Sequence, residues 1–271
     1  EGLLSALAFF PSDEQAIGFV RRVRGDFADR PPPGTVSPIA LEFFDSRAFD
    51  FLRERKAEEG AASTIPEIPE GARAGVLFEQ GYTEDALLDI YEGWEAALAG
   101  YGSSMEQTWG GMDESDLEKL KALRHGVAEQ VNGAIARAKA EYPEIHKIGT
   151  DIAVPPHAIE EMFAFYRESL EGTGLPYVVF GHIGDSHLHL NIMPRDHDEL
   201  ARAEELALLF AERAVSLGGT VSAEHGIGKM KHDFLKLMFG ETGLAEMAAL
   251  KKALDPRGVL NRGVMFPESL L

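Results

Sequence analysis

The chain has 271 residues, 45% of them hydrophobic, so it can bury a substantial core and is globular rather than disordered. Asp and Glu total 45 against 26 Lys and Arg, and the net charge of −19 argues against nucleic acid as a partner. The sequence has no cysteine, which excludes disulfides, thiolate metal ligands and a cysteine nucleophile, and no apolar run is long enough to span a bilayer.

The first 110 residues predict the order strand, helix, two strands, helix. Apolar runs favour strands at residues 3–10, 39–44 and 75–80. Ser12 is the predicted N-cap of the first helix, with Gln15 as its capping-box partner. Thr83 is the predicted cap of the second helix.

The same order of elements returns in the second half of the chain. The elements predicted there are a helix at 115–139, a strand at 148–154, a helix opened by Pro155-Pro156, a hairpin at 177–193, a helix from Asp196 to 217, a short strand at 220–223 and two closing helices within 228–256.

This repeated order predicts an α+β fold class. Two ferredoxin-like strand-helix-strand units, at about 1–110 and 145–225, are expected to join into one large, mostly antiparallel sheet with helices on one face. Closing helices and a tail at 228–271 complete a single domain over residues 1–271. The other face of the sheet would be free to serve as a floor for ligands.

The predicted hairpin carries a dense group of side chains that can bind metal. Gly184-Asp185 is a turn signal between two apolar segments, and this turn sets His182 opposite His187. Side chains alternate along a strand, so His187, His189 and Asn191 share one side. Three imidazoles are therefore expected on one patch of the sheet.

A catalytic metal site commonly combines two histidines with one carboxylate, since this set leaves coordination positions open. Glu224 is the candidate carboxylate, because the segment Ser222-Ala-Glu-His-Gly-Ile-Gly228 joins a predicted strand to a helix. Glu224 as a ligand and His225 as a free base is the economical assignment. Nitrogen and oxygen donors suit Zn²⁺, with Mn²⁺ or Fe²⁺ as alternatives.

Other readings stay open from the residues alone. The histidines could be hydrogen-bonded polar groups on an open sheet face, and the chain a non-catalytic interaction module. Two His and one Glu could also activate water in a self-contained hydrolase. Gly226-Ile-Gly228 lacks the spacing of a dinucleotide-binding loop, and neither a Gly-x-Ser-x-Gly elbow nor a phosphate-binding loop is present.

Three ordered motifs carry a family resemblance. They are Gly-His-Ile-Gly-Asp-Ser-His-Leu-His-Leu-Asn at 181–191, Ser-Ala-Glu-His-Gly-Ile-Gly at 222–228, and Leu-Asp-Pro-Arg-Gly-Val-Leu-Asn at 254–261. Together they resemble the C-terminal domain of FAD-linked oxidases, a group that includes D-lactate dehydrogenases, the glycolate oxidase flavoprotein subunit and D-2-hydroxyglutarate dehydrogenase. The resemblance extends from the opening apolar strand to Asn261.

The resemblance implies a substrate-binding cap domain of an FAD-dependent dehydrogenase that oxidises a 2-hydroxy acid. FAD would be held mainly by another domain, in the same full-length chain or as a split subunit, and this chain alone would be inactive. An electron acceptor and a cytoplasmic location, or a peripheral one at the inner face of the membrane, are also implied. The implied roles are metal ligand for His182, His189 and Glu224, catalytic base for His225, substrate contact for Asn191 and Arg124, and flavin-side contact for Asn261.

The sequence departs from the family pattern at three places. His187 stands where relatives usually have Asn, which adds a third imidazole to the site. The motif at 261–264 lacks the usual proline and following lysine. Lys147 lies two residues further from Asp151 than the substrate lysine of some relatives does.

Overall fold

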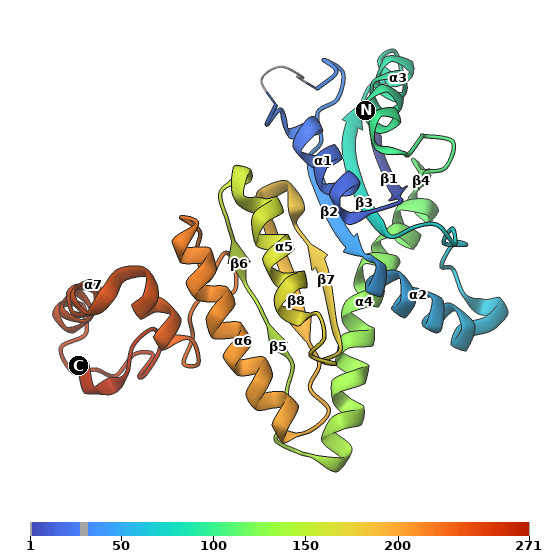
Figure 1. Ribbon diagram of the computed structural model, residues 1–271. Helices are drawn as coiled ribbons and strands as arrows, with labels where there is room; N and C mark the ends of the chain where they lie inside the picture. The colour runs from blue at the N-terminus through green and yellow to red at the C-terminus, as the bar shows by residue number, and fades with distance from the viewer. Residues whose placement is uncertain (1, 28–31, 271) are drawn as a thin grey trace.

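The computed structural model describes residues 2–27 and 32–270, so Glu1 and Leu271, the ends of the expected domain, lie outside the described residues. One large antiparallel sheet with helices packed against it confirms the predicted α+β class (Figure 1). The strands are β1 (Gly2–Phe10), β2 (Ala40–Asp45), β3 (Ala74–Tyr82), β4 (Trp109–Gly111), β5 (Ile148–Gly149), β6 (Ile152–Ala153), β7 (Tyr177–Gly181) and β8 (His187–Ile192). The helices are α1 (Asp13–Arg24), α2 (Ser46–Glu59), α3 (Leu87–Leu98), α4 (Glu114–Glu141), α5 (Ile159–Leu170), α6 (His197–Ser216) and α7 (His232–Leu254).

The sheet joins the two halves of the chain in the strand order β4-β1-β3-β2-β7-β8-β5, with β6 paired to β8. The junction is the antiparallel pair β2 and β7, in which Phe43 faces Gly181 and Phe44 faces Phe180. The other strand pairs are antiparallel too. The hairpin of the second half is thereby placed beside a strand from the first half.

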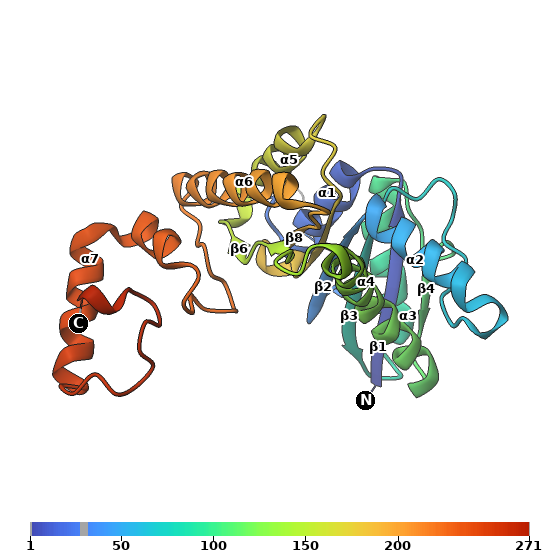
Figure 2. The ribbon, with the colours of Figure 1, turned by 90° about the horizontal axis from the view of Figure 1, so that it is seen from below.

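Helices cover both faces of the sheet, which differs from the expectation of helices on one face. One layer consists of α1, α3, α5 and α6, and its core includes Ala6, Ala8 and Phe10 of β1. On the opposite face α2 and α4 pack over Leu7 and Phe9 of the same strand (Figure 2). Both faces of β1 are apolar, so both need a cover, as in sheets buried on two sides.

Two predicted strands are shorter than expected, for a local polar reason. The segment at 148–154 is divided into β5 and β6, because the Thr150 hydroxyl accepts a hydrogen bond from the Leu190 amide in place of a regular backbone partner. The segment at 220–223 forms only one isolated bridge, between Thr220 and Ala153. This chain segment is instead fixed by side-chain contacts to Asp151.

The predicted helix caps have mixed outcomes. Ser12 and Asp196 accept hydrogen bonds from the backbone amides of Gln15 and Glu199, as capping requires. The predicted Thr83 cap is wrong, because α3 begins only at Leu87, after a turn, and has no side-chain cap.

The closing region consists of α7 and the tail after it, and it extends away from the sheet (Figure 2). The backbone of Gly240 is non-helical, with φ of 65°, so α7 is kinked there and comprises two helical segments. These two segments correspond to the two closing helices expected within 228–256. No helix within residues 2–27 and 32–270 is apolar enough over a sufficient length to cross a membrane.

Candidate metal centre and substrate cavity

The hairpin of β7 and β8 brings three imidazoles together. A short turn at Ile183–Asp185 joins the strands, and the His187 amide donates to the His182 carbonyl at 3.1 Å. The ring centroids of His187 and His189 are 4.4 Å apart, and that of His182 lies 5.5 Å and 5.3 Å from them. Leu188 and Leu190 point to the opposite side, into the core. The expected shared patch of imidazoles is therefore present.

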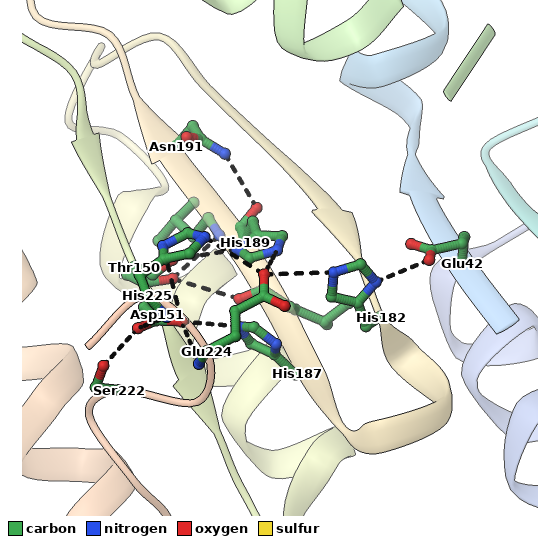
Figure 3. A network of polar contacts seen from close by, with 12 residues as sticks. Glu42, Thr150, Asp151, His182, His187, His189, Asn191, Ser222, Glu224 and His225 are labelled. Carbon is green, nitrogen blue, oxygen red and sulfur yellow. Dashed lines mark hydrogen bonds and ion pairs between the residues drawn. The ribbon is translucent and has the colours of Figure 1, made fainter. Parts of the chain in front are cut away.

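Glu224 reaches this patch from a segment distant in sequence. Its Oε1 lies 3.4 Å from Nε2 of His182 and 3.3 Å from Nε2 of His189 (Figure 3). Two donors that each lie about 2.1 Å from a tetrahedral Zn²⁺ are about 3.4 Å apart. The donor types and their spacing therefore fit a divalent cation held by His182, His189 and Glu224.

Asp151, between β5 and β6, anchors the segment that carries Glu224. Its buried carboxylate accepts hydrogen bonds from Ser222 Oγ at 2.7 Å and from the amides of Glu224 and His225 at 3.1 and 3.0 Å. Lys231 Nζ adds a contact at 3.3 Å. Burial raises the pKa of Asp151, but these donors outweigh burial and lower it to about 2. Asp151 is thus a fixed anion beneath the site.

His225 lies next to the candidate ligands with its ring largely accessible. The His225 side chain is 58% exposed, its Nε2 is 3.3 Å from Glu224 Oε1, and its ring is stacked on His189 with centroids 5.3 Å apart. Its amide is held by Asp151, as described above. An exposed imidazole at a fixed place beside a cation site can accept a proton from a bound molecule.

A carboxylate from β2 supports the site from the other side. The buried Glu42 has Oε1 2.7 Å from His182 Nδ1 and 2.7 Å from Arg124 Nη2. Arg124, on α4, also has Nη2 3.4 Å from His182 Nδ1. Glu42 thus connects a candidate metal ligand with the candidate substrate arginine.

A cavity of about 540 Å³ adjoins the cluster. His189, Asn191 and His225 line it, and its wall also contains three lysines, Lys147, Lys229 and Lys231. The buried Asn191 donates from Nδ2 to the His189 carbonyl at 3.4 Å. A small anionic molecule could therefore enter beside the imidazoles of an otherwise acidic protein.

His187 and His189 favour the neutral form of the imidazole. Burial lowers the pKa of His189 to about 4, helped by the neighbouring His187 and His182. Burial also lowers the pKa of His187. Burial raises the pKa of Glu224, but the surrounding histidines outweigh it and the net shift is downward. Neutral imidazoles and an ionised carboxylate are the forms that bind metal.

Sequence reasoning missed two site residues, Asp151 and Glu42. The available signal was a lone acidic residue inside an otherwise apolar strand segment, since such a carboxylate must be buried with partners. Asn261 is not among the residues that line the cavity. It lies exposed in the tail, which contacts the cavity loop through the Met265 amide and the Gly228 carbonyl.

Comparison with protein families gives a match over nearly the whole chain. The profile described as FAD linked oxidases, C-terminal domain, matches residues 4–265. The chain belongs to this family. This FAD-linked oxidase C-terminal domain is also similar in sequence to two bacterial proteins.

The glycolate oxidase subunit GlcD of Bacillus subtilis is 30% identical over 233 residues, covering 85% of this chain and 46% of that protein. D-2-hydroxyglutarate dehydrogenase of Xanthomonas citri pv. viticola is 31% identical over 280 residues, covering 93% of this chain and 56% of that protein. The chain thus spans about half the length of these relatives.

Solved structures share the fold. The 4-ethylphenol oxidase from Gulosibacter chungangensis has a TM-score of 0.61 at 14% identity, with 99% of this chain and 55% of that chain covered. p-Cresol methylhydroxylase has a TM-score of 0.61 at 11% identity, with 98% and 53% covered. At these identities the likeness concerns the fold alone.

Proposed function

We propose that this chain is the substrate-binding and catalytic cap domain of a flavin-dependent dehydrogenase that oxidises a small 2-hydroxy acid, such as D-lactate or glycolate. The observation that carries the proposal is the convergence of His182, His189 and Glu224 beside a cavity with three lysines in its wall. Family membership and the names of the relatives, a glycolate oxidase subunit and a D-2-hydroxyglutarate dehydrogenase, support the substrate class.

A divalent cation would be held by His182, His189 and Glu224. We propose Zn²⁺ as this cation, with Mn²⁺ or Fe²⁺ as alternatives. When bound, such a cation polarises a substrate hydroxyl and lowers its pKa, and FAD supplies the acceptor for a hydride. The distances of 3.4 and 3.3 Å from Glu224 Oε1 to Nε2 of His182 and His189 support a bound cation rather than a hydrogen-bonded cluster.

The chain's own residues would bind the substrate and move its proton. His225 takes the hydroxyl proton, since its ring is exposed beside Glu224. The guanidinium of Arg124, oriented by Glu42, holds the substrate carboxylate. Asn191 contributes a fixed amide to the cavity wall, and Asn261 in the tail is proposed to lie on the flavin side.

FAD would be bound mainly by another domain of the same full-length protein or by a separate subunit. The chain has no dinucleotide-binding loop, and the exposed ring of His225 leaves the reacting side of the site accessible to such a partner. The electron acceptor and the cytoplasmic or membrane-peripheral location stay predictions.

The test is substrate-dependent dye reduction by the FAD-containing protein that includes this chain. D-lactate, glycolate and D-2-hydroxyglutarate would be compared, with His225→Gln as the variant and His197→Gln, an exposed histidine on α6, as the matched control. We expect at least one acid to be oxidised, His225→Gln to lower kcat by about 10²- to 10⁴-fold, and His197→Gln to have no effect.

Two results would contradict the proposal. Hydrolysis of esters or amides by this chain without flavin, lost in Glu224→Gln, would support a metal-dependent hydrolase instead. Failure to bind any divalent metal after chelation and reconstitution, together with no oxidation of any 2-hydroxy acid, would favour a non-catalytic module.

A further inference from the structure

His187 occupies a buried place in the histidine cluster that the three-ligand site does not use. It is the first residue of β8, is 4% exposed, and its ring lies nearest to His189. The preceding residue, Ser186, has a left-handed backbone with φ of 53°, and Arg24 Nη1 donates to its Oγ at 2.7 Å. The turn therefore presents His187 in one fixed orientation.

The ring nitrogen Nε2 of His187 is buried, and no group within residues 2–27 and 32–270 is aligned to hydrogen-bond with it. Asp151 Oδ1 lies 3.3 Å away, within ion-pair distance but outside hydrogen-bond geometry. Burial of an imidazole nitrogen without a partner costs free energy, so such a group in a native fold requires an explanation.

The geometry of the cluster offers that explanation. One metal-binding atom from each of His182, His187, His189 and Glu224 can be chosen so that all four lie within 4.8 Å of one another. We propose that His187 is a fourth protein ligand of the cation, so that the site is built from three imidazoles and one carboxylate. This inference rests on the metal site proposed above.

A fourth ligand changes what the site can hold. Four protein donors complete a tetrahedral Zn²⁺ shell, so a substrate oxygen must enter as a fifth ligand or displace one of them. Three imidazoles also favour Zn²⁺, Co²⁺ and Ni²⁺ over Mn²⁺, which prefers oxygen donors. The chain should therefore select Zn²⁺ over Mn²⁺ more strongly than its His187→Asn variant.

The experiment measures metal affinity and the number of coordinating imidazoles in the 271-residue chain. Zn²⁺ and Mn²⁺ dissociation constants come from competition with a chelator, and pulsed EPR of the Cu²⁺-loaded chain counts bound imidazoles. The variants are His187→Asn, His182→Ala and, as the exposed matched control, His197→Asn. The side-chain amide introduced by His187→Asn can still donate toward Asp151.

We expect three coordinating imidazoles in the unaltered chain and two in His187→Asn, with Zn²⁺ bound at least about tenfold more weakly and Mn²⁺ affected less. If His187→Asn does not fold, His225→Asn replaces it, and a count that stays at three assigns the third imidazole to His187. A count that falls in His225→Asn overturns the inference.

The outcomes also separate this inference from the proposed function. One outcome is that the unaltered chain binds Zn²⁺, that His182→Ala loses it, and that His187→Asn changes neither the affinity nor the number of coordinating imidazoles. This outcome refutes only the fourth ligand. If the unaltered chain binds no Zn²⁺, the metal site fails together with the fourth ligand.

Discussion

The Glu42 carboxylate lies 2.7 Å from Nδ1 of His182, across the junction between β2 and β7. A proton on Nδ1 shared with this carboxylate leaves the Nε2 lone pair free on the side of Glu224. Carboxylates that orient a histidine in this way raise its strength as a metal ligand. The sheet junction between the two halves of the chain is thus part of the site.

Glu42→Gln should weaken metal binding although Glu42 is not a proposed ligand. The neutral amide cannot fix the His182 tautomer or the Arg124 guanidinium equally well, so we expect the Zn²⁺ dissociation constant to rise by about 10- to 100-fold. Chelator competition measures this change. Glu79→Gln, which alters a glutamate on β3 bound to Ser5, is the control. Equal affinities in both variants would refute this role of Glu42.

Asp151→Asn should release the segment that carries Glu224. The substitution replaces one acceptor oxygen of a buried carboxylate with a donor, so the hydrogen bonds from Ser222 and from two backbone amides cannot all persist. We expect the free energy of unfolding, from urea titration, to fall by about 2 to 3 kcal/mol and Zn²⁺ to bind more weakly. Asp185→Asn, at an exposed turn position, should change neither quantity.

Arg24→Lys should loosen the turn between the site histidines. Arg24 Nη1 donates to the carbonyls of Ile183 and Gly184 and to Ser186 Oγ, a set that a single ammonium group on a flexible stem holds less firmly. We expect faster amide hydrogen exchange at residues 183–187 and severalfold weaker Zn²⁺ binding. Arg53→Lys, in a surface pair with Asp50, is the control. Unchanged exchange in Arg24→Lys would show that the turn is stable without this contact.

Asp45 should make the metal-free protein less stable as pH rises. Burial raises the pKa of Asp45 to about 7, with Asp13 also raising it and Arg47 lowering it. Between about pH 4 and 7 the native carboxyl keeps a proton that the unfolded chain has released, so the free energy of unfolding falls across this window. The difference from the ordinary value of 3.8 corresponds to roughly 4 kcal/mol at most.

Urea unfolding of the chain and of Asp45→Asn at pH 4.5, 6 and 7.5 isolates this effect, because the two proteins differ only at this carboxyl group. The stability of the unaltered chain relative to Asp45→Asn should decrease with pH. Asp50→Asn, at an exposed position on α2, should show no such trend. A relative stability that is constant over these pH values would mean that Asp45 is ionised throughout.

Local sequence patterns predicted the parts of the site that depend on local structure. Alternation along a strand placed His187 and His189 on one side, and the turn at Gly184-Asp185 brought His182 to them. Most helices and long strands followed from apolar periodicity in the same way.

Contacts between distant segments could not be predicted from such patterns. Glu42 meets His182 only because β2 pairs with β7, and strand order is not encoded in periodicity. Thr150 divides a segment that reads as one continuous strand, because its hydroxyl binds the Leu190 amide, and the adjacent Asp151 carboxylate binds the distant 222–225 segment. The second helical layer was also missed, since apolar residues on both faces of β1 do not reveal which helices cover them.

One divalent cation should bind between the hairpin histidines and Glu224. Anomalous diffraction at the zinc edge from crystals of the Zn²⁺-loaded chain tests it most directly. We predict one strong peak within about 2.0 to 2.2 Å of Nε2 of His182, Nε2 of His189 and a Glu224 carboxylate oxygen. Zinc found only at surface histidines such as His197, with the hairpin cluster empty, would contradict the account.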